Sequence, residues 1–79
     1  MIKITIYSKP GCHLCDDMKA VVTRVAGRTA TIDEVDITSD PELQRLYALE
    51  IPVLVINGRK IAKYRIDEPT LKRALEAGR

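Results

Sequence analysis

The two cysteines of the chain, Cys12 and Cys15, stand three positions apart with His13 and Leu14 between them. At this CxxC spacing two thiols share one face of a helix, where a bridge closes with little backbone movement. A sulfur at the first turn also faces unpaired N–H groups and the positive end of the helix dipole, which favour thiolate over thiol. The pair therefore predicts thiol–disulfide catalysis, with Cys12 as the attacking sulfur and Cys15 as the resolving one.

Two other interpretations of this pair stay open at this point. Both cysteines could be small apolar residues of the core, because free cysteine is among the most buried residue types. A structural zinc site needs four ligands, whereas Cys12, Cys15 and the single histidine, His13, supply three. We therefore expect no metal site formed by this chain alone, since a metal would require a second chain or a cofactor.

Length and charge limit the classes of function. With 79 residues, we expect a single domain over residues 1–79. A hydrophobic fraction of 46%, a charged fraction of 30% and a net charge of +2 without a basic tract predict no nucleic-acid partner. Met1 leads directly into an alternating strand, and no apolar run approaches membrane-spanning length. We expect a cytoplasmic protein without a membrane partner, in a reducing compartment where close cysteines favour catalysis over structural bridging.

The first half of the chain predicts a strand, a helix and a second strand that position the cysteines. Isoleucines alternate with polar residues over residues 1–7, which is typical of a strand. Apolar residues then recur at helical spacing until Gly27, and Cys15 falls on this apolar stripe while Cys12 stands at the helix start. Residues 30–37 predict a second, parallel strand.

The second half predicts a helix, a hairpin and a last helix. Ser39 and Glu42 form a possible capping box before a short helix that carries four apolar residues, Leu43, Leu46, Tyr47 and Leu49. The apolar run 53–56 predicts a buried strand, and Asn57-Gly58 turns the chain into an edge strand over residues 59–64. A final helix starts at residues 67–69 and ends at Gly78.

With the cysteines at the end of the first strand, the order βαβαββα leads to a family resemblance. The whole chain resembles glutaredoxins and small glutaredoxin-like members of the thioredoxin superfamily. The resemblance is carried by Tyr7-Ser8-Lys9 ahead of Cys12-His13-Leu14-Cys15, by Ile51-Pro52 ahead of a buried strand, and by Ile56-Asn57-Gly58. It implies an α/β fold of the thioredoxin/glutaredoxin type, with a four-stranded mixed sheet flanked by three helices.

The resemblance also implies substrate-binding residues. Pro52 is expected in the cis form, facing the cysteines, and the backbone of Ile51 is expected to pair with a bound peptide or thiol. Lys9 is expected to supply a positive charge to the sulfur or to a substrate carboxylate, although it could equally be an ordinary solvated lysine. His13 could favour the Cys12 thiolate when protonated, or simply point to solvent.

Two stretches differ from a typical glutaredoxin. Relatives carry Pro-Tyr between the cysteines and Gly-Gly, a small polar and an acidic residue after the hairpin, where they hold glutathione. Here the stretches read His13-Leu14 and Ala62-Lys63-Tyr64-Arg65, and the acidic residue is displaced to Asp67. Side chains now fill the space that glycines leave open to a ligand. We therefore expect no cofactor and no efficient use of glutathione.

The favoured hypothesis is a monomeric thiol–disulfide oxidoreductase. It would reduce disulfides of proteins or small molecules and be recharged by a reductant dithiol system. Two alternatives use the same cysteines: a metal or iron–sulfur binding module, which could be dimeric, and a redox-sensing adaptor.

Overall fold

A computed structural model describes residues 2–77 of the chain. Its elements are β1 (Ile2–Ser8), α1 (His13–Ala26), β2 (Ala30–Asp36), a 3-10 turn (Ile37–Ser39), α2 (Pro41–Tyr47), β3 (Val53–Ile56), β4 (Arg59–Lys63) and α3 (Glu68–Ala77). The strands form one sheet in the order β2-β1-β3-β4. β1 runs parallel to β2 and antiparallel to β3, and β4 runs antiparallel to β3. The predicted mixed four-stranded sheet with three helices is confirmed.

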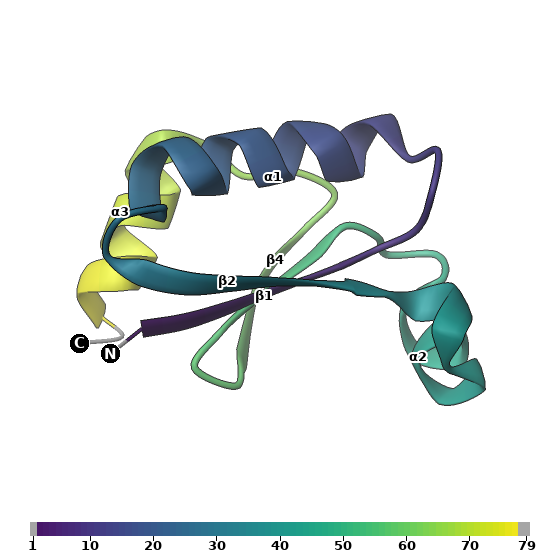
Figure 1. Ribbon diagram of the computed structural model, residues 1–79. Helices are drawn as coiled ribbons and strands as arrows, with labels where there is room; N and C mark the ends of the chain where they lie inside the picture. The colour runs from purple at the N-terminus through teal and green to yellow at the C-terminus, as the bar shows by residue number, and fades with distance from the viewer. Residues whose placement is uncertain (1, 78–79) are drawn as a thin grey trace.

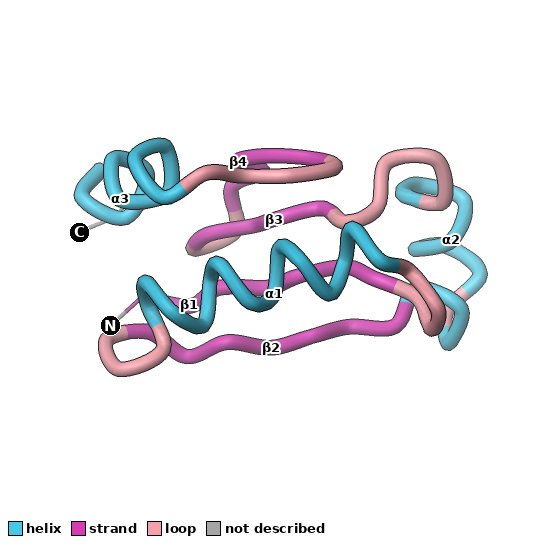
Figure 2. Tube along the Cα trace, turned by 90° about the horizontal axis from the view of Figure 1, so that it is seen from above, coloured by secondary structure: helices cyan, strands magenta, loops and turns pink. Residues whose placement is uncertain are grey.

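The helices are unevenly distributed over the sheet. Helices α1 and α3 cover one face, whereas α2 lies beyond the end of β2, as Figures 1 and 2 show. The core forms between this face of the sheet and the two helices, because the inward isoleucines of β1 meet the apolar stripe of α1. Its buried members are Ile4, Ile6, Met18, Val22, Ala26, Leu54, Ile56 and Leu71. Helix α1 is therefore fixed along its length, and its amino end is held at the carboxyl end of β1.

The hairpin between β3 and β4 follows the predicted turn chemistry. Asn57 and Gly58 have φ angles of 50° and 84°, the positive values that a type I′ turn requires at both central residues. The predicted strand 59–64 is one residue too long, because β4 ends at Lys63 and Tyr64 has a φ of 71°. A residue in this left-handed region cannot continue a strand.

The segment between β2 and α2 also differs from the prediction. The strand predicted over residues 30–37 ends at Asp36, whose carboxylate accepts the Thr38 N–H at 2.8 Å and starts the 3-10 turn. The Ser39 capping box is wrong: the side chain of Asp40 caps α2 by accepting the Glu42 N–H at 2.9 Å. The Ser39 hydroxyl instead donates to the carbonyl of Asp36 at 2.7 Å.

Helix α2 is shorter than predicted and none of its residues is fully buried. Leu49, which was expected on it, lies after its last residue Tyr47, and the helix holds to the sheet through Tyr47, whose ring stacks on Tyr7 at 4.7 Å between centroids. Two predicted positions, the strand start at Met1 and the helix end at Gly78, lie outside the described residues. Over residues 2–77 the structure contains no helix with the length and apolar character needed to cross a membrane.

Candidate active site

The CxxC motif occupies the junction between β1 and α1. β1 ends at Ser8, and the chain turns through Pro10 and Gly11, whose φ of 79° is readily adopted by glycine alone. Cys12 then caps α1 with extended backbone angles, and its Sγ accepts the Cys15 N–H at 3.1 Å. The sulfur thus satisfies one of the N–H groups that a helix start leaves unpaired.

The two cysteines differ in exposure. Cys15 faces the core and only 1% of its surface is exposed, whereas Cys12 is half-buried. They are joined by a disulfide, with 5.2 Å between their Cα atoms. Of the two cysteines, only Cys12 is partly exposed to an approaching molecule, as its place before the apolar stripe predicts.

Ile51 and Pro52 lie beside the motif because of the sheet register. Val53 pairs with Tyr7, so that Pro52 lies opposite Ser8 at the end of β1. In Figures 1 and 2 the α2–β3 and β1–α1 connections meet at the same end of the sheet. Pro52 is buried, the peptide bond before it is cis, and its carbonyl accepts the Tyr64 N–H at 2.9 Å. The backbone groups of Ile51 make no hydrogen bond within residues 2–77.

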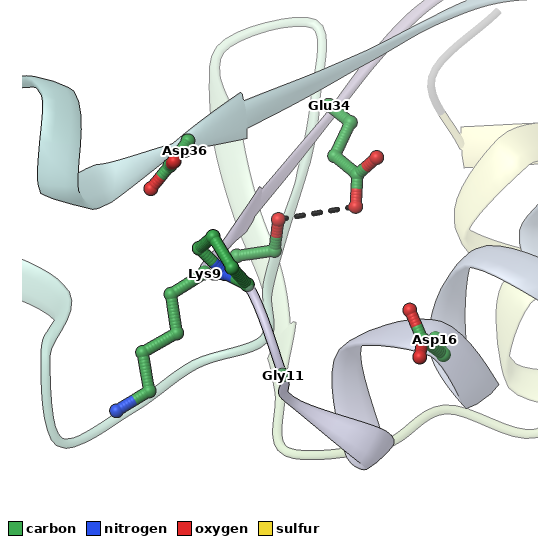
Figure 3. Close-up of a pocket in the computed structure, with 7 residues that line it drawn as sticks. Lys9, Gly11, Asp16, Glu34 and Asp36 are labelled. Atoms are coloured by element: carbon green, nitrogen blue, oxygen red, sulfur yellow. Dashed lines mark hydrogen bonds between the residues drawn. The ribbon is translucent and has the colours of Figure 1, made fainter.

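The two charged or titratable candidates at the motif are both exposed. His13 is the first residue of α1 and lies on the surface. Lys9 lines a cavity, and its side chain extends away from Glu34 and Asp16 (Figure 3). It makes no salt bridge to any residue from 2 to 77. Its ammonium group is therefore available to a ligand.

The cavity that Lys9 lines has three acidic residues and was not predicted from the sequence. It has a volume of about 270 Å³ and is lined by Ser8, Lys9, Pro10, Gly11, Asp16, Glu34 and Asp36. The pairing of β1 with β2 explains this grouping, because Ser8 pairs with Asp36 and Ile6 with Glu34. The signal available in the sequence was the row of acidic residues at the end of a second parallel strand.

Glu34 organises the polar contacts of this cavity. It accepts the hydroxyl of Ser8, which is only 4% exposed, at 3.1 Å, and the ammonium of Lys19 at 3.0 Å. The hydrogen bond from Lys19 lowers the pKa of Glu34 below its ordinary value of 4.5; partial burial opposes this and the Ser8 hydroxyl adds to it. The carboxylate thus stays charged at neutral pH and ties α1 to both parallel strands.

We expect replacement of Glu34 by glutamine to lower the melting temperature by a few degrees at pH 7. Because folding lowers the Glu34 pKa, the carboxylate stabilises the fold above its ordinary pKa and this contribution is lost as the pH falls through the lowered value. The difference in melting temperature between wild type and Glu34→Gln should therefore be smaller at pH 3 than at pH 7. Circular-dichroism melts at both pH values measure this, and an equal difference at pH 3 would contradict the assigned role.

The stretch that holds glutathione in typical glutaredoxins is filled differently here. Ala62 is half-buried, Lys63 is exposed, and the ring of Tyr64 follows, with the Lys63 ammonium 5.5 Å from its centroid. Asp67, the displaced acidic residue, accepts the Thr70 N–H at 2.8 Å in the first turn of α3, and the Thr70 side chain first, then this N–H, lowers the pKa of its carboxyl. Its carboxylate thus already has a structural role. Among residues 2–77, no three or more His, Cys, Asp or Glu side chains are grouped to hold a metal ion.

Comparisons with known proteins agree with this geometry. The family model described as "Glutaredoxin-like domain (DUF836)" matches residues 3–76. The Dictyostelium discoideum protein named "Glutaredoxin-like protein YDR286C homolog" is 32% identical over 95% of this chain and 76% of its own length.

Two solved structures show the same fold. The protein XcR50 from X. campestris has a TM-score of 0.81 at 32% identity, covering 94% of this chain and 96% of that one. A mutant thioredoxin from Halobacterium salinarum has a TM-score of 0.69 at 23% identity, covering 96% and 73%. The fold is thus of the thioredoxin type. Because the family model matches residues 3–76, a range that includes Cys12 and Cys15, the chain belongs to the glutaredoxin-like domain family.

Proposed function

We propose that this protein is a thiol–disulfide oxidoreductase in which Cys12 attacks and Cys15 resolves. The observation that supports this most strongly is the difference between the two sulfurs. Cys12 caps α1, is partly exposed and accepts a backbone N–H, whereas Cys15 is buried one turn further along. The family and its fold support a redox role for such a pair.

The reaction transfers two electrons through one mixed disulfide. The Cys12 thiolate attacks one sulfur of the substrate disulfide, forming a Cys12–substrate bond and releasing the other substrate sulfur as a thiolate that takes a proton. The Cys15 thiol then loses its proton, attacks the Cys12 sulfur and releases the second substrate thiol. The substrate disulfide is reduced to two thiols, and the dithiol is oxidised to the Cys12–Cys15 disulfide.

The chain supplies three features that favour these steps. The start of α1 stabilises negative charge on the Cys12 sulfur and so favours the thiolate that attacks the substrate. The Cα atoms of the cysteines are 5.2 Å apart, within the range for an unhindered bridge. Beside them, Ile51 offers free backbone groups to an extended substrate, Pro52 shapes the adjoining surface, and Lys9 offers a cation.

A second dithiol must return the oxidised protein to its active form. We propose a protein dithiol donor of the kind that a thioredoxin reductase system provides, rather than glutathione, because side chains occupy the space of the family's glycines. The proposal further places the protein in the cytoplasm as a monomer, without a metal or cofactor.

A reduction assay tests this function directly. With dithiothreitol as electron source, the protein should accelerate the reduction of insulin disulfides well above the uncatalysed rate. The double variant Cys12→Ser/Cys15→Ser, which has no thiol and whose fold is checked by circular dichroism, is the matched control and should remain at the uncatalysed rate. Equal rates for the two proteins, particularly with iron or zinc in the purified wild type, would instead favour a metal-binding module.

A further inference from the structure

Four large hydrophobic side chains are exposed within residues 2–77, and two of them lie together beside the cysteine site. Leu49 is 89% exposed and Tyr64 is 43% exposed, and the Tyr64 hydroxyl donates to the Leu49 carbonyl at 3.0 Å. They come from the α2–β3 connection and from the residue after β4, which lie at the same end of the molecule (Figure 2). We call these two residues the Leu49–Tyr64 platform.

The backbone of Tyr64 is strained in order to hold this position. Its φ is 71°, and the Arg65 N–H reaches across it to the Lys63 carbonyl at 2.9 Å, which makes a tight γ-turn. An aromatic residue rarely adopts such a φ, and backbone strain of this kind clusters at functional sites. The turn directs the Tyr64 N–H to Pro52 and its hydroxyl to Leu49.

The connection that carries Leu49 is fixed on both sides. Tyr47 stacks on Tyr7 before it, and the Pro52 carbonyl accepts the Tyr64 N–H after it. Between them, Glu50 is paired with Lys60. Leu49 is therefore an apolar side chain exposed to solvent on a segment held by these contacts, three residues before Pro52. Holding it there reduces the entropy that a binding partner must supply.

Beside the platform lie Glu50, which is paired with Lys60, and two cations that form no salt bridge among the described residues. Lys63 and Arg65 flank Tyr64, both are exposed, and neither forms a salt bridge with another residue of the 2–77 segment. Ile51, whose backbone groups form no hydrogen bond within residues 2–77, lies between Leu49 and Pro52 in the sequence. A complementary ligand would pair with that backbone, bury an apolar side chain and carry a negative charge.

We propose that the Leu49–Tyr64 platform determines substrate specificity. Its occupant is an extended segment of a disulfide-bonded protein that carries a large apolar residue next to an acidic one, close to the disulfide cysteine. This inference rests on the proposed reductase function and names its substrate class. Leu49 contacts the apolar side chain, Tyr64 positions Leu49 and completes the surface, and Lys63 and Arg65 receive the carboxylate.

The test uses three disulfide substrates and two matched variants. Two peptides differ only beside their disulfide, one carrying Leu-Glu and the other Ser-Lys, and the third substrate is a small dialkyl disulfide without neighbouring side chains. Leu49→Ser removes the apolar contact. Leu46→Ser is the matched control, because Leu46 is an exposed leucine, 48% accessible, that lies on α2 outside the platform.

We expect the wild type to have a KM about tenfold lower for the Leu-Glu peptide than for the Ser-Lys peptide, the effect of partly burying one leucine side chain. Leu49→Ser should remove this preference by raising the KM for the Leu-Glu peptide, with kcat and the rate on the small disulfide unchanged. Leu46→Ser should behave as wild type. Tyr64→Phe, which keeps the ring but loses the bond to Leu49, should raise the same KM severalfold.

The outcomes separate this inference from the function on which it rests. If no substrate is reduced, the proposed function fails and the inference with it. The inference alone is overturned if the small disulfide is reduced but the wild type has the same KM for both peptides. The same holds if Leu46→Ser raises the KM for the Leu-Glu peptide as much as Leu49→Ser does. A change in sedimentation on Leu49→Ser without a change in KM would mean that the platform binds a second copy of the chain, which also overturns it.

Discussion

The single variants Cys12→Ser and Cys15→Ser should both lose turnover, but for different reasons. Cys12→Ser removes the sulfur that reaches the substrate, so neither reduction nor a covalent adduct is expected. Cys15→Ser keeps the attack and removes the intramolecular resolving step, which gains several orders of magnitude from proximity. We therefore expect insulin reduction by either variant to fall at least about a hundredfold, with a mixed disulfide on Cys12 accumulating only in Cys15→Ser.

Mass spectrometry of the two variants after mixing with an oxidised substrate separates these cases. An adduct on Cys12→Ser, through Cys15, and none on Cys15→Ser would reverse the two roles.

We also expect the rate of turnover to depend strongly on the electron donor. In an assay coupled to glutathione and glutathione reductase, we expect turnover at least about tenfold slower than with a thioredoxin reductase system. The physical reason is local: the half-buried side chain of Ala62, the exposed Lys63 and the ring of Tyr64 occupy the stretch where glycines would admit glutathione. Lys9 and the Ile51 backbone still offer contacts, so weak glutathione binding is compatible with slow turnover.

A mixed disulfide between glutathione and a small thiol is the suitable substrate for both assays. The double variant without cysteines controls for direct reduction by either donor system. Robust turnover with glutathione and none with the thioredoxin reductase would contradict the donor assignment. It would mean that the altered hairpin flank binds glutathione by another geometry.

The fold could be predicted from the sequence where hydrophobic period and turn chemistry agree. The alternating isoleucines specify β1, Cys15 and Met18 mark the buried stripe of α1, and Asn57-Gly58 specifies the hairpin. The predicted bounds are wrong where a local side-chain contact determines the end of a helix or strand. Ser39 and Asp40 are both acceptable helix caps, and the sequence does not show that the Ser39 hydroxyl bonds to Asp36 instead.

The sequence predicts only the part of the site whose residues are close together along the chain. Cys12 and Cys15 are three residues apart, so the helix pattern alone separates their environments. The acidic cavity around Glu34 depends on the register between β1 and β2, and the Leu49–Tyr64 platform on a hydrogen bond between distant loops. Neither relation leaves a periodic signal in the chain. Tyr64 is the clearest case, because a γ-turn at an aromatic residue contradicts its local preference.

The most direct measurement of the assigned roles is competitive alkylation of the fully reduced wild-type protein. Iodoacetamide is added below stoichiometry, and the labelled cysteine is identified by peptide mass mapping. Because Cys12 is partly exposed at the start of α1 and Cys15 is buried, we predict that Cys12 takes up nearly all of the label. Preferential labelling of Cys15 would contradict the proposal that Cys12 is the attacking sulfur.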